Sequence, residues 1–402
     1  MKTLEAVAGP GRAFAMGPFG SNIKTENFVQ SGVPVIQGRN LKGTRLDEND
    51  FVFLTDEKTN ELSASVVKSG DIVITHRGTL GQVVMIPRTS RYPRYVVSQS
   101  QMKVSVDEDK MSPEFVTYWL QSSIGQAELF AYASQTGVPA IAQPLASLRK
   151  MRVICPPLDE QRAIVGVLEA LDDKIESNRQ QVRVLDELMV SVYQASLSGD
   201  LVPFLEVASP VSGGTPRRSE PEFWTPEIPW ASAKDISAAS AGVILSTLEQ
   251  ISQSGLSNSA AELVPAGTTI ITARGTVGAV ARLGMAATFN QSCYGLIPAD
   301  PRVHYLEVYL STRAGVDELK RSSHGTVFDT ITRQTFELLK VQRPDERSRT
   351  QTVTELESLD RLVIARLRES SKVMELRDTL LPELLSGRLR VRDAEKVVEG
   401  AA

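Results

Sequence analysis

Residues 66–83 read VVKSGDIVITHRGTLGQV, and residues 263–280 read LVPAGTTIITARGTVGAV. Both segments place an apolar, β-branched run before an RGT triplet, and a glycine follows the triplet after one further residue. This pattern predicts two strands joined by a tight, glycine-containing hairpin loop. Because the pattern occurs twice, about 200 residues apart, the chain is predicted to be a duplication of one structural plan.

Other matches keep the same order along the chain on both sides of this segment. They pair Val33–Val35 with Ile228–Trp230, Arg39–Leu41 with Lys234–Ile236, Ser98–Ser100 with Asn290–Ser292, and Ser198–Leu201 with Ser386–Leu389. Ser112-Pro113 and Asp300-Pro301 each combine an N-cap residue with proline, which predicts a helix start in both halves. Each half therefore repeats a globular region followed by a helix.

A long helix is predicted after Pro156-Pro157, because residues 159–196 lack proline and contain a single glycine. Its apolar residues follow a 4-3 spacing that is typical of a coiled coil, interrupted by Asn178. The predicted interface residues are Ile164, Leu168, Leu171, Ile175, Val182 and Leu185, and those of a second such helix after Pro344 are Leu356, Leu359, Val363 and Leu367. Either each helix packs on its own globular domain, or the two helices pair antiparallel, with Asn178 fixing their register.

Composition predicts a globular chain of two or three domains: 402 residues, 42% of them hydrophobic, and a formal charge of −4. No apolar run is long enough for a membrane span, and two cysteines are too few for a disulfide framework, so a cytoplasmic location is expected. Charge is uneven. Residues 1–155 carry 17 Lys and Arg against 14 Asp and Glu, whereas residues 156–200 carry 4 against 9.

Catalytic motifs are missing from the sequence. It has no GxxxxGK[ST] loop, HExxH, GxSxG or CxxC, and no [DN]PP[YF] tetrapeptide of the amino-methyltransferases. His76 in the first half corresponds to Ala273 in the second, so the halves do not share a histidine-dependent reaction. We therefore expect no catalytic residue and no metal site.

The candidate functional residues are cations in predicted loops. Arg77 and Arg274 lie in the repeated RGT loop, where they either are exposed hairpin residues or meet a phosphate. A basic loop at residues 88–95 either is a solvated loop or binds DNA. The full set of candidate DNA contacts is Arg39, Arg77, Arg88, Arg91, Tyr92, Arg94, Arg217, Lys234 and Arg274.

The whole chain resembles the specificity subunit of type I restriction-modification enzymes. The resemblance rests on the duplicated plan, the helix start PPLDEQRAI at residues 156–164, the SGDL at 198–201, the RGT loops, and the GGTP at 213–216. The second helix start, RPDERSRTQ at residues 343–351, departs from the PxxEQ pattern of that family.

The resemblance implies an α+β fold with two pseudo-symmetric target-recognition domains and two long helices that pair as an antiparallel coiled coil. The expected boundaries are 1–155 for the first recognition domain, 156–200 for the first helix, 201–342 for the second domain, 343–395 for the second helix, and 396–402 for a disordered tail. Each domain would read one half of a bipartite, asymmetric DNA site, while the helices set the spacing of the halves.

The implied partners are double-stranded DNA, two modification (methyltransferase) subunits that dock on the helices, and a restriction subunit with motor activity, but no membrane. The chain itself would bind no cofactor, since S-adenosylmethionine, ATP and Mg²⁺ belong to the partner subunits. Two alternatives stay open: a catalytic DNA methyltransferase or nuclease with degenerate motifs, and a coiled-coil scaffold for proteins without a DNA role.

Overall fold

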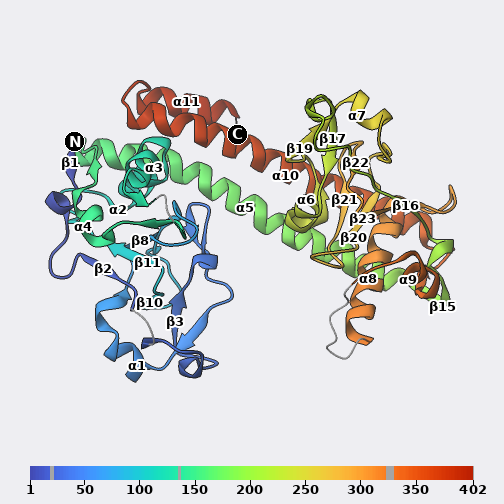
Figure 1. Ribbon diagram of the computed structural model, residues 1–402, viewed down its shortest axis with the longest axis horizontal. Helices are drawn as coiled ribbons and strands as arrows, with labels where there is room; N and C mark the ends of the chain where they lie inside the picture. Colours follow the sequence, from blue (N-terminus) through green and yellow to red (C-terminus); the bar gives the residue numbers. More distant parts are fainter. Residues whose placement is uncertain (19–21, 135–136, 323–329, 402) are drawn as a thin grey trace. The chain divides into compact units, whose positions relative to one another are not determined.

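The computed structural model describes the chain except for residues 19–21, 135–136, 323–329 and 402 (Figure 1). It consists of two compact units. Unit 1 comprises residues 1–175 and 373–402, and unit 2 comprises residues 176–372. Helix α5 (Leu158–Ser196) and helix α10 (Arg349–Leu385) each begin in one unit and end in the other.

Unit 1 contains two principal sheets. The first has the strand order β2 (Phe14–Met16), β11 (Gln101–Val104), β8 (Ile72–Thr75), β9 (Val83–Met85), β5 (Arg45–Leu46) and β4 (Leu41–Lys42). The second has the order β6 (Val52–Leu54), β3 (Val33–Ile36), β10 (Tyr95–Val97) and β7 (Val66–Val67). Short strand pairs join β1 (Lys2–Thr3) to β14 (Arg152–Val153) and β12 (Ala133–Ser134) to β13 (Ala140–Ile141). The helices are α1 (Asp56–Glu61), α2 (Pro113–Gln121), α3 (Ser123–Phe130), α4 (Pro144–Lys150) and α11 (Val391–Ala401).

Unit 2 repeats this plan. Its five-stranded sheet has the order β16 (Ala208–Ser212), β23 (Cys293–Pro298), β20 (Thr269–Thr272), β21 (Val280–Leu283) and β18 (Val243–Ile244). Its three-stranded sheet has the order β19 (Glu249–Ile251), β17 (Ile228–Ala231) and β22 (Thr288–Phe289), and β15 (Leu197–Pro203) pairs with β24 (Lys340–Pro344). The helices are α6 (Ala233–Ala238), α7 (Gln253–Ser257), α8 (Tyr305–Ser322) and α9 (Arg333–Leu338).

The repeated segment forms the centre of each unit. Strand β8 is buried on both faces, since Ile72 and Ile74 face one hydrophobic cluster while Val73 faces another. In unit 2, Ile271 and Ile270 of β20 divide in the same way between two clusters. Burial on both faces explains why these strands read as continuous apolar runs without polar alternation. The predicted strand–hairpin–strand is confirmed in both halves.

The stripe of apolar residues predicted on the two long helices is buried or half-buried within the chain itself. In unit 1, Ile164, Leu168, Leu171 and Ile175 of α5 share one cluster with Val373 and Leu380 of α10 and with Phe115 and Trp119 of α2. In unit 2, Val182 and Leu185 pack with Leu356, Leu359, Val363 and Leu367 of α10, and with Leu306 and Leu310 of α8. Each helix therefore packs both on the other helix and on its globular domain. The two arrangements that the sequence offered as alternatives occur together.

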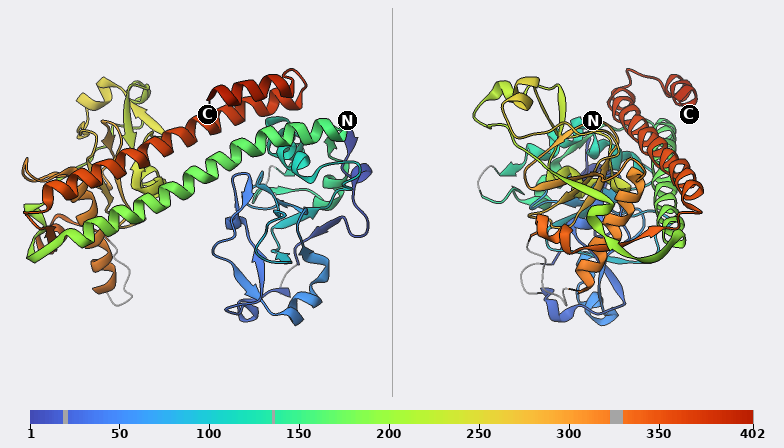
Figure 2. Two further views of the ribbon diagram at one scale, coloured as in Figure 1. Left: turned by 180° about the vertical axis from the view of Figure 1, so that it is seen from behind. Right: turned by 90° about the vertical axis from the view of Figure 1, so that its right-hand side faces the viewer.

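The two helices run antiparallel. In unit 1 Arg377 Nη1 of α10 donates to Asp172 Oδ1 of α5 at 2.8 Å, and in unit 2 Arg366 Nε donates to Gln181 Oε1 at 2.8 Å. The beginning of α5 thus pairs with the end of α10, and the reverse pairing holds in the other unit (Figure 2). Asn178 is fully buried, and its amide has no hydrogen-bond partner among the described residues. Its role in fixing the register stays a prediction.

A buried aspartate connects each helix to the domain that precedes it. Asp172 accepts hydrogen bonds from the Tyr118 hydroxyl at 2.7 Å and from Arg377. At the equivalent place in α10, Asp360 Oδ2 accepts from the Tyr305 hydroxyl at 2.9 Å, and its Oδ1 accepts from Arg282 Nε at 2.8 Å. Burial and the Asp360 carboxylate raise the pKa of Tyr305, which keeps this hydroxyl protonated as a donor.

Replacing Asp360 with Asn is expected to destabilise unit 2 by about 3–5 kcal/mol, because the guanidinium of Arg282 would stay buried without a charged partner. The side chains of Arg282 and Asp360 are 2% and 3% exposed. Thermal unfolding and amide exchange in α8 and β21 measure the effect. Glu318→Gln, which removes a solvent-exposed partner of Arg321 in the same unit, is the control and should change neither. Equal stability of both variants would contradict this account of the pair.

Two sequence-based expectations differ from the structure. Helix α2 begins at Pro113 with Ser112 as its N-cap, but α8 begins at Tyr305 and not at Pro301. The reason is that Asp300 Oδ1 accepts from the N–H of Arg302 at 2.8 Å, which closes a turn before the helix. The disordered tail expected at 396–402 was wrong for residues up to 401, because α11 buries Ala394 and packs Val398 on the core of unit 1.

Candidate nucleic-acid interface

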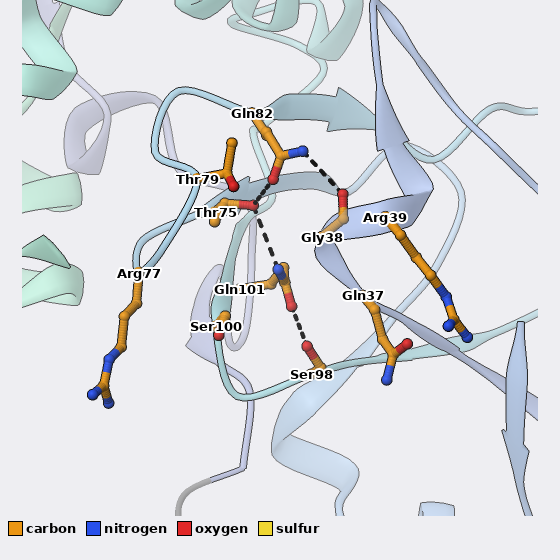
Figure 3. Close-up of a pocket in the computed structure, with 10 residues that line it drawn as sticks. All are labelled: Gln37, Gly38, Arg39, Thr75, Arg77, Thr79, Gln82, Ser98, Ser100 and Gln101. Atoms are coloured by element: carbon orange, nitrogen blue, oxygen red, sulfur yellow. Dashed lines mark hydrogen bonds between the residues drawn. The ribbon is translucent and has the colours of Figure 1, made fainter. Parts of the chain in front are cut away.

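Three strands of unit 1 end at one edge and carry polar loops there. Strands β3 and β10 pair in parallel, so the loops that follow them, residues 37–39 and 98–100, lie at the same edge. The end of strand β8 lies at the same edge, because the N–H of His76, the residue after β8, donates to the Ser100 carbonyl at 2.9 Å. Arg77 follows directly. These loops surround a cavity of about 480 Å³ (Figure 3), lined by Gln37, Gly38, Arg39, Thr75, Arg77, Thr79, Gln82, Ser98, Ser100 and Gln101. The lining contains two arginines and no carboxylate.

The RGT loop has the same conformation in both units. Gly78 and Gly275 have φ values of 91° and 78°, and the N–H two residues later donates to each glycine carbonyl, at 2.9 and 3.0 Å. A Cβ atom at either glycine would meet open space, so the left-handed backbone and not a close contact requires glycine. Arg77 and Arg274 are exposed and have no ion-pair partner among the described residues.

A second cation is presented in the same way in each unit. The N–H of Gln37 donates to Asn40 Oδ1 at 3.0 Å, and the N–H of Ser232 donates to Asp235 Oδ2 at 2.8 Å. Each of these bonds caps the first turn of a helix that carries an exposed cation, Arg39 in the 3-10 helix Gly38–Asn40 of unit 1 and Lys234 in α6 of unit 2. Arg39 Nε lies 3.5 Å from the exposed carboxylate of Asp50, a weak surface pair.

In unit 2 the GGTP turn packs on the same edge. The N–H of Gly214 donates to the Phe289 carbonyl at 2.9 Å, and a Cβ on Gly213 would lie 2.2 Å from the Asn290 carbonyl oxygen. Only glycine fits there. The N–H of Asn290 in turn donates to the carbonyl of Ala231, which immediately precedes the Lys234 loop, at 3.0 Å. The structure therefore carries Arg217, Lys234 and Arg274 on adjoining loops, and Arg217 is exposed like the other two.

Unit 1 repeats this contact at Gly17, where a Cβ would lie 1.8 Å from the Ser98 carbonyl oxygen. Gly17 and Gly213 thus occupy corresponding positions, each against the loop that follows the parallel strand. The edge is consequently built by the same four loops in both units, and in both it presents exposed cations.

The basic loop at residues 88–95 lies elsewhere. Arg88 contacts Glu108 at 2.8 Å and Glu114 at 3.3 Å, and Arg94 contacts Asp56 and Asn60. The N–H of Ile86 donates to the carbonyl of Asp71 at the start of β8, so Arg88 follows the end of the β8–β9 pair opposite to Arg77. Tyr92 packs among Phe51, Phe53 and Tyr95. Arg91 is exposed without an ion pair among the described residues. The structure therefore does not bring this loop to the cavity.

His76 is a buried structural residue that stands between Thr75 and Arg77 in the sequence and does not line the cavity. Its Nε2 lies 3.0 Å from the Gln99 carbonyl, and burial lowers the pKa of the imidazole below its ordinary value, an effect that the positive charge of Arg77 increases. Among the described residues, no group of three or more His, Cys, Asp or Glu side chains is arranged to hold a metal ion.

The lowered pKa of His76 predicts how stability depends on pH. Below about pH 6.5 the unfolded chain binds a proton that the folded chain does not, so the stability of unit 1 should fall as pH decreases from 7 to 5. In His76→Ala, which has the residue found at the equivalent position of unit 2, this part of the pH dependence should disappear. Thermal unfolding midpoints at several pH values test it, and identical slopes for both proteins would contradict it.

Sequence reasoning missed the three glutamines that line the cavity, Gln37, Gln82 and Gln101. The repeat contained a signal for one of them, because Gln82 of the first copy aligns with the apolar residue Ala279 of the second. Sequence reasoning also missed Arg218, which forms a bidentate pair with Glu249 and lies 3.6 Å above the ring of Trp224. Finally, Cys155 and Cys293 are free, and no described helix is long and apolar enough to cross a membrane.

The chain consists of two domains built on one plan, each with an edge that presents exposed cations, and of an antiparallel helix pair. Residues 20–186 and 202–373 each match the family described as the type I restriction modification DNA specificity domain. The chain belongs to this family and contains its domain twice. It is a DNA sequence-specificity subunit of the type I restriction-modification class.

Relatives agree with this assignment, and a solved structure is similar in fold. A protein of Methanocaldococcus jannaschii, provisionally named the type I restriction enzyme MjaX specificity subunit, is 18% identical over 91% of this chain and 89% of its own length. The HindI specificity subunit of Haemophilus influenzae is 24% identical over 44% of this chain and 39% of its own. The crystal structure of the S subunit of a type I system from M. genitalium is similar in fold, with a TM-score of 0.53 and 15% identity over 95% of both chains.

Proposed function

We propose that the repeated edge of each unit reads one half of a bipartite DNA site. The observation that carries the proposal is that two units with different loop sequences present exposed cations at two corresponding places. These are Arg39 and Lys234 after one strand of the parallel pair, and Arg77 and Arg274 in the RGT loop. The proposed contacts are Arg39 and Arg77 in unit 1 and Arg217, Lys234 and Arg274 in unit 2. Arginine and lysine suit this role because they bind both phosphates and the acceptor edge of guanine.

The other candidates receive different roles. Arg91 is proposed as a phosphate contact outside the cavity, because its guanidinium is exposed and unpaired among the described residues. Arg88 and Arg94 are assigned to their ion pairs, and Tyr92 to the aromatic cluster around it. The half-sites should differ in sequence, because Gln82 and Gln101 of unit 1 have no amide counterpart at Ala279 and Cys293 of unit 2.

The long helices are proposed to set the distance between the half-sites and to dock two modification subunits. The apolar stripe is buried inside the chain, so a partner must use the other faces of the helices. On α5 in unit 2, Val184 and Leu188 are one turn apart and 62% and 45% exposed. Val184→Lys combined with Leu188→Lys should abolish co-purification with a modification subunit. Substituting the neighbouring exposed polar residues Arg183 and Glu187 with Ala should not, and equal retention by both variants would exclude this surface.

Chemistry is proposed to reside in the partners. The modification subunits would supply S-adenosylmethionine-dependent adenine methylation, and a restriction subunit would supply Mg²⁺- and ATP-dependent cleavage, while this chain supplies recognition and no catalytic group. A methylation assay of the chain alone tests this assignment. We expect no product without the modification subunit, and product from the chain alone would show that it is a catalytic methyltransferase.

DNA binding by the full chain with its modification subunit tests the role in recognition. Phosphate contacts release counterions, so the logarithm of the binding constant should fall linearly with the logarithm of salt concentration. Binding that is absent, or that salt does not change, would favour a protein scaffold without a DNA role.

A further inference from the structure

A network of side-chain hydrogen bonds lines the cavity of unit 1 (Figure 3). Gln82 Oε1 accepts from the Thr75 hydroxyl at 2.9 Å, and the Thr75 oxygen accepts from Gln101 Nε2 at 3.4 Å. The Ser98 hydroxyl donates to Gln101 Oε1. This network joins the end of β8, the hairpin loop before β9, the start of β11 and the loop after β10, and all four of its side chains line the cavity.

Gln82 also holds the loop that carries Arg39. Its Nε2 donates to the carbonyl of Gly38 at 2.9 Å and to that of Leu41 at 3.0 Å. These two acceptors stand on either side of Arg39, so one amide group fixes both ends of the loop. Gln82 itself belongs to the hairpin that carries Arg77, since it follows Gly81. A single side chain therefore links the two cationic loops of unit 1.

The described residues of unit 2 form no such link. At the position of Gln82 it has Ala279, whose N–H donates to the Thr272 hydroxyl at 2.9 Å. The Thr272 hydroxyl donates in turn to the carbonyl of Thr276 in its own loop. The RGT hairpin of unit 2 is thus closed on itself, whereas that of unit 1 is tied to the neighbouring loop.

We propose that Gln82 is a positioning residue for sequence discrimination in unit 1: it holds Arg39 at a fixed place relative to Arg77, and so sets which bases the first half-site must contain. This inference rests on the proposed function of the cavity edge. A neutral amide contributes no charge to DNA binding, so its removal should change base preference more than affinity for DNA in general.

The test uses the full chain with its modification subunit and a randomised duplex library, from which bound sequences are enriched and read. In Gln82→Ala, discrimination at the first half-site should fall about tenfold, the scale of one good base contact. Discrimination at the second half-site and the salt dependence should stay unchanged. Gln82→Met keeps the approximate size and the neutrality of the side chain but cannot donate to the two carbonyls, and it should lose the same discrimination.

Gln126→Ala is the matched control. Its amide also donates to two carbonyls, those of Gly81 at 3.0 Å and Leu120 at 2.7 Å, so it supports the same hairpin without contacting the Arg39 loop. It should keep the wild-type preference. An equal loss in Gln126→Ala, a loss at both half-sites, or unchanged preference in both Gln82 variants would overturn the inference. Arg77→Ala distinguishes failure of the proposed function from failure of the role inferred for Gln82. If it leaves binding and preference intact, the proposed function fails, whereas an effect of Arg77→Ala without one of Gln82 leaves that function standing.

Discussion

Inserting seven residues into each long helix, between Ile175 and Glu176 in α5 and between Lys372 and Val373 in α10, is expected to lengthen the permitted gap between the half-sites by about three base pairs. Seven helical residues add about 10 Å, and B-DNA rises about 3.4 Å per base pair. The two positions are those at which the compact units meet in sequence, so neither globular domain is altered. A heptad returns the apolar stripe to nearly the same face, which preserves the helix pairing.

Matched insertions in both helices are necessary because the helices are antiparallel and bonded to each other in each unit, through Arg377 and Asp172 and through Arg366 and Gln181. Selection from duplexes with gaps of different length measures the result. Replacing the same number of exposed helix residues without changing helix length is the control and should leave the gap as it was. A variant that binds both half-sites at the original gap would contradict the role of the helices as a ruler.

Arg77→Ala and Arg274→Ala are each expected to weaken specific binding by roughly 5- to 150-fold, the range for loss of a bidentate base contact. Arg77→Ala should relax the first half-site alone, and Arg274→Ala the second alone, because the two arginines belong to different units. The losses should multiply in the double variant, since separate sites act independently.

The salt dependence separates two kinds of contact. If an arginine binds a phosphate, its loss should weaken binding to all sequences alike and lower the salt slope by about 1. If it binds a base, the loss should be confined to one position of the site. Arg88→Ala is the control, because Arg88 is paired with Glu108 and Glu114 and follows the opposite end of the β8–β9 pair. Unchanged binding in both cavity variants, or an equal effect of Arg88→Ala, would argue against the proposed edge.

Much of the architecture could be predicted because the chain contains an internal repeat, whose two copies can be compared with each other. Two copies of the hairpin segment identified the central strands, and the equivalence of Arg77 with Arg274 identified loops with the same conformation. The equivalence of Arg39 with Lys234 identified two helical turns that are capped by corresponding hydrogen bonds. The spacing of Ile164, Leu168, Leu171 and Ile175 similarly sufficed for a buried stripe on α5. These features depend on local patterns, which a sequence contains directly.

Features that depend on distant neighbours could not be predicted. The sequence predicted Arg88 and Arg94 as DNA contacts. In the folded chain they form ion pairs with Glu108, Glu114 and Asp56, which are distant in sequence. The pairing of Gln82 with the carbonyls of Gly38 and Leu41 depends in the same way on residues about 40 positions away. At Asp300 the carboxylate could accept a backbone N–H either as a helix cap or within a local turn, and the structure shows the turn.

Mapping the modified adenines in the genome of cells that carry this chain with its modification subunit tests the central claim most directly. The account predicts one asymmetric site with two different half-sites separated by a gap of fixed length and free sequence. Exchanging unit 1 for that of another family member should change one half-site and leave the other intact. A single continuous site, or modification that does not depend on this chain, would contradict recognition by two separate units.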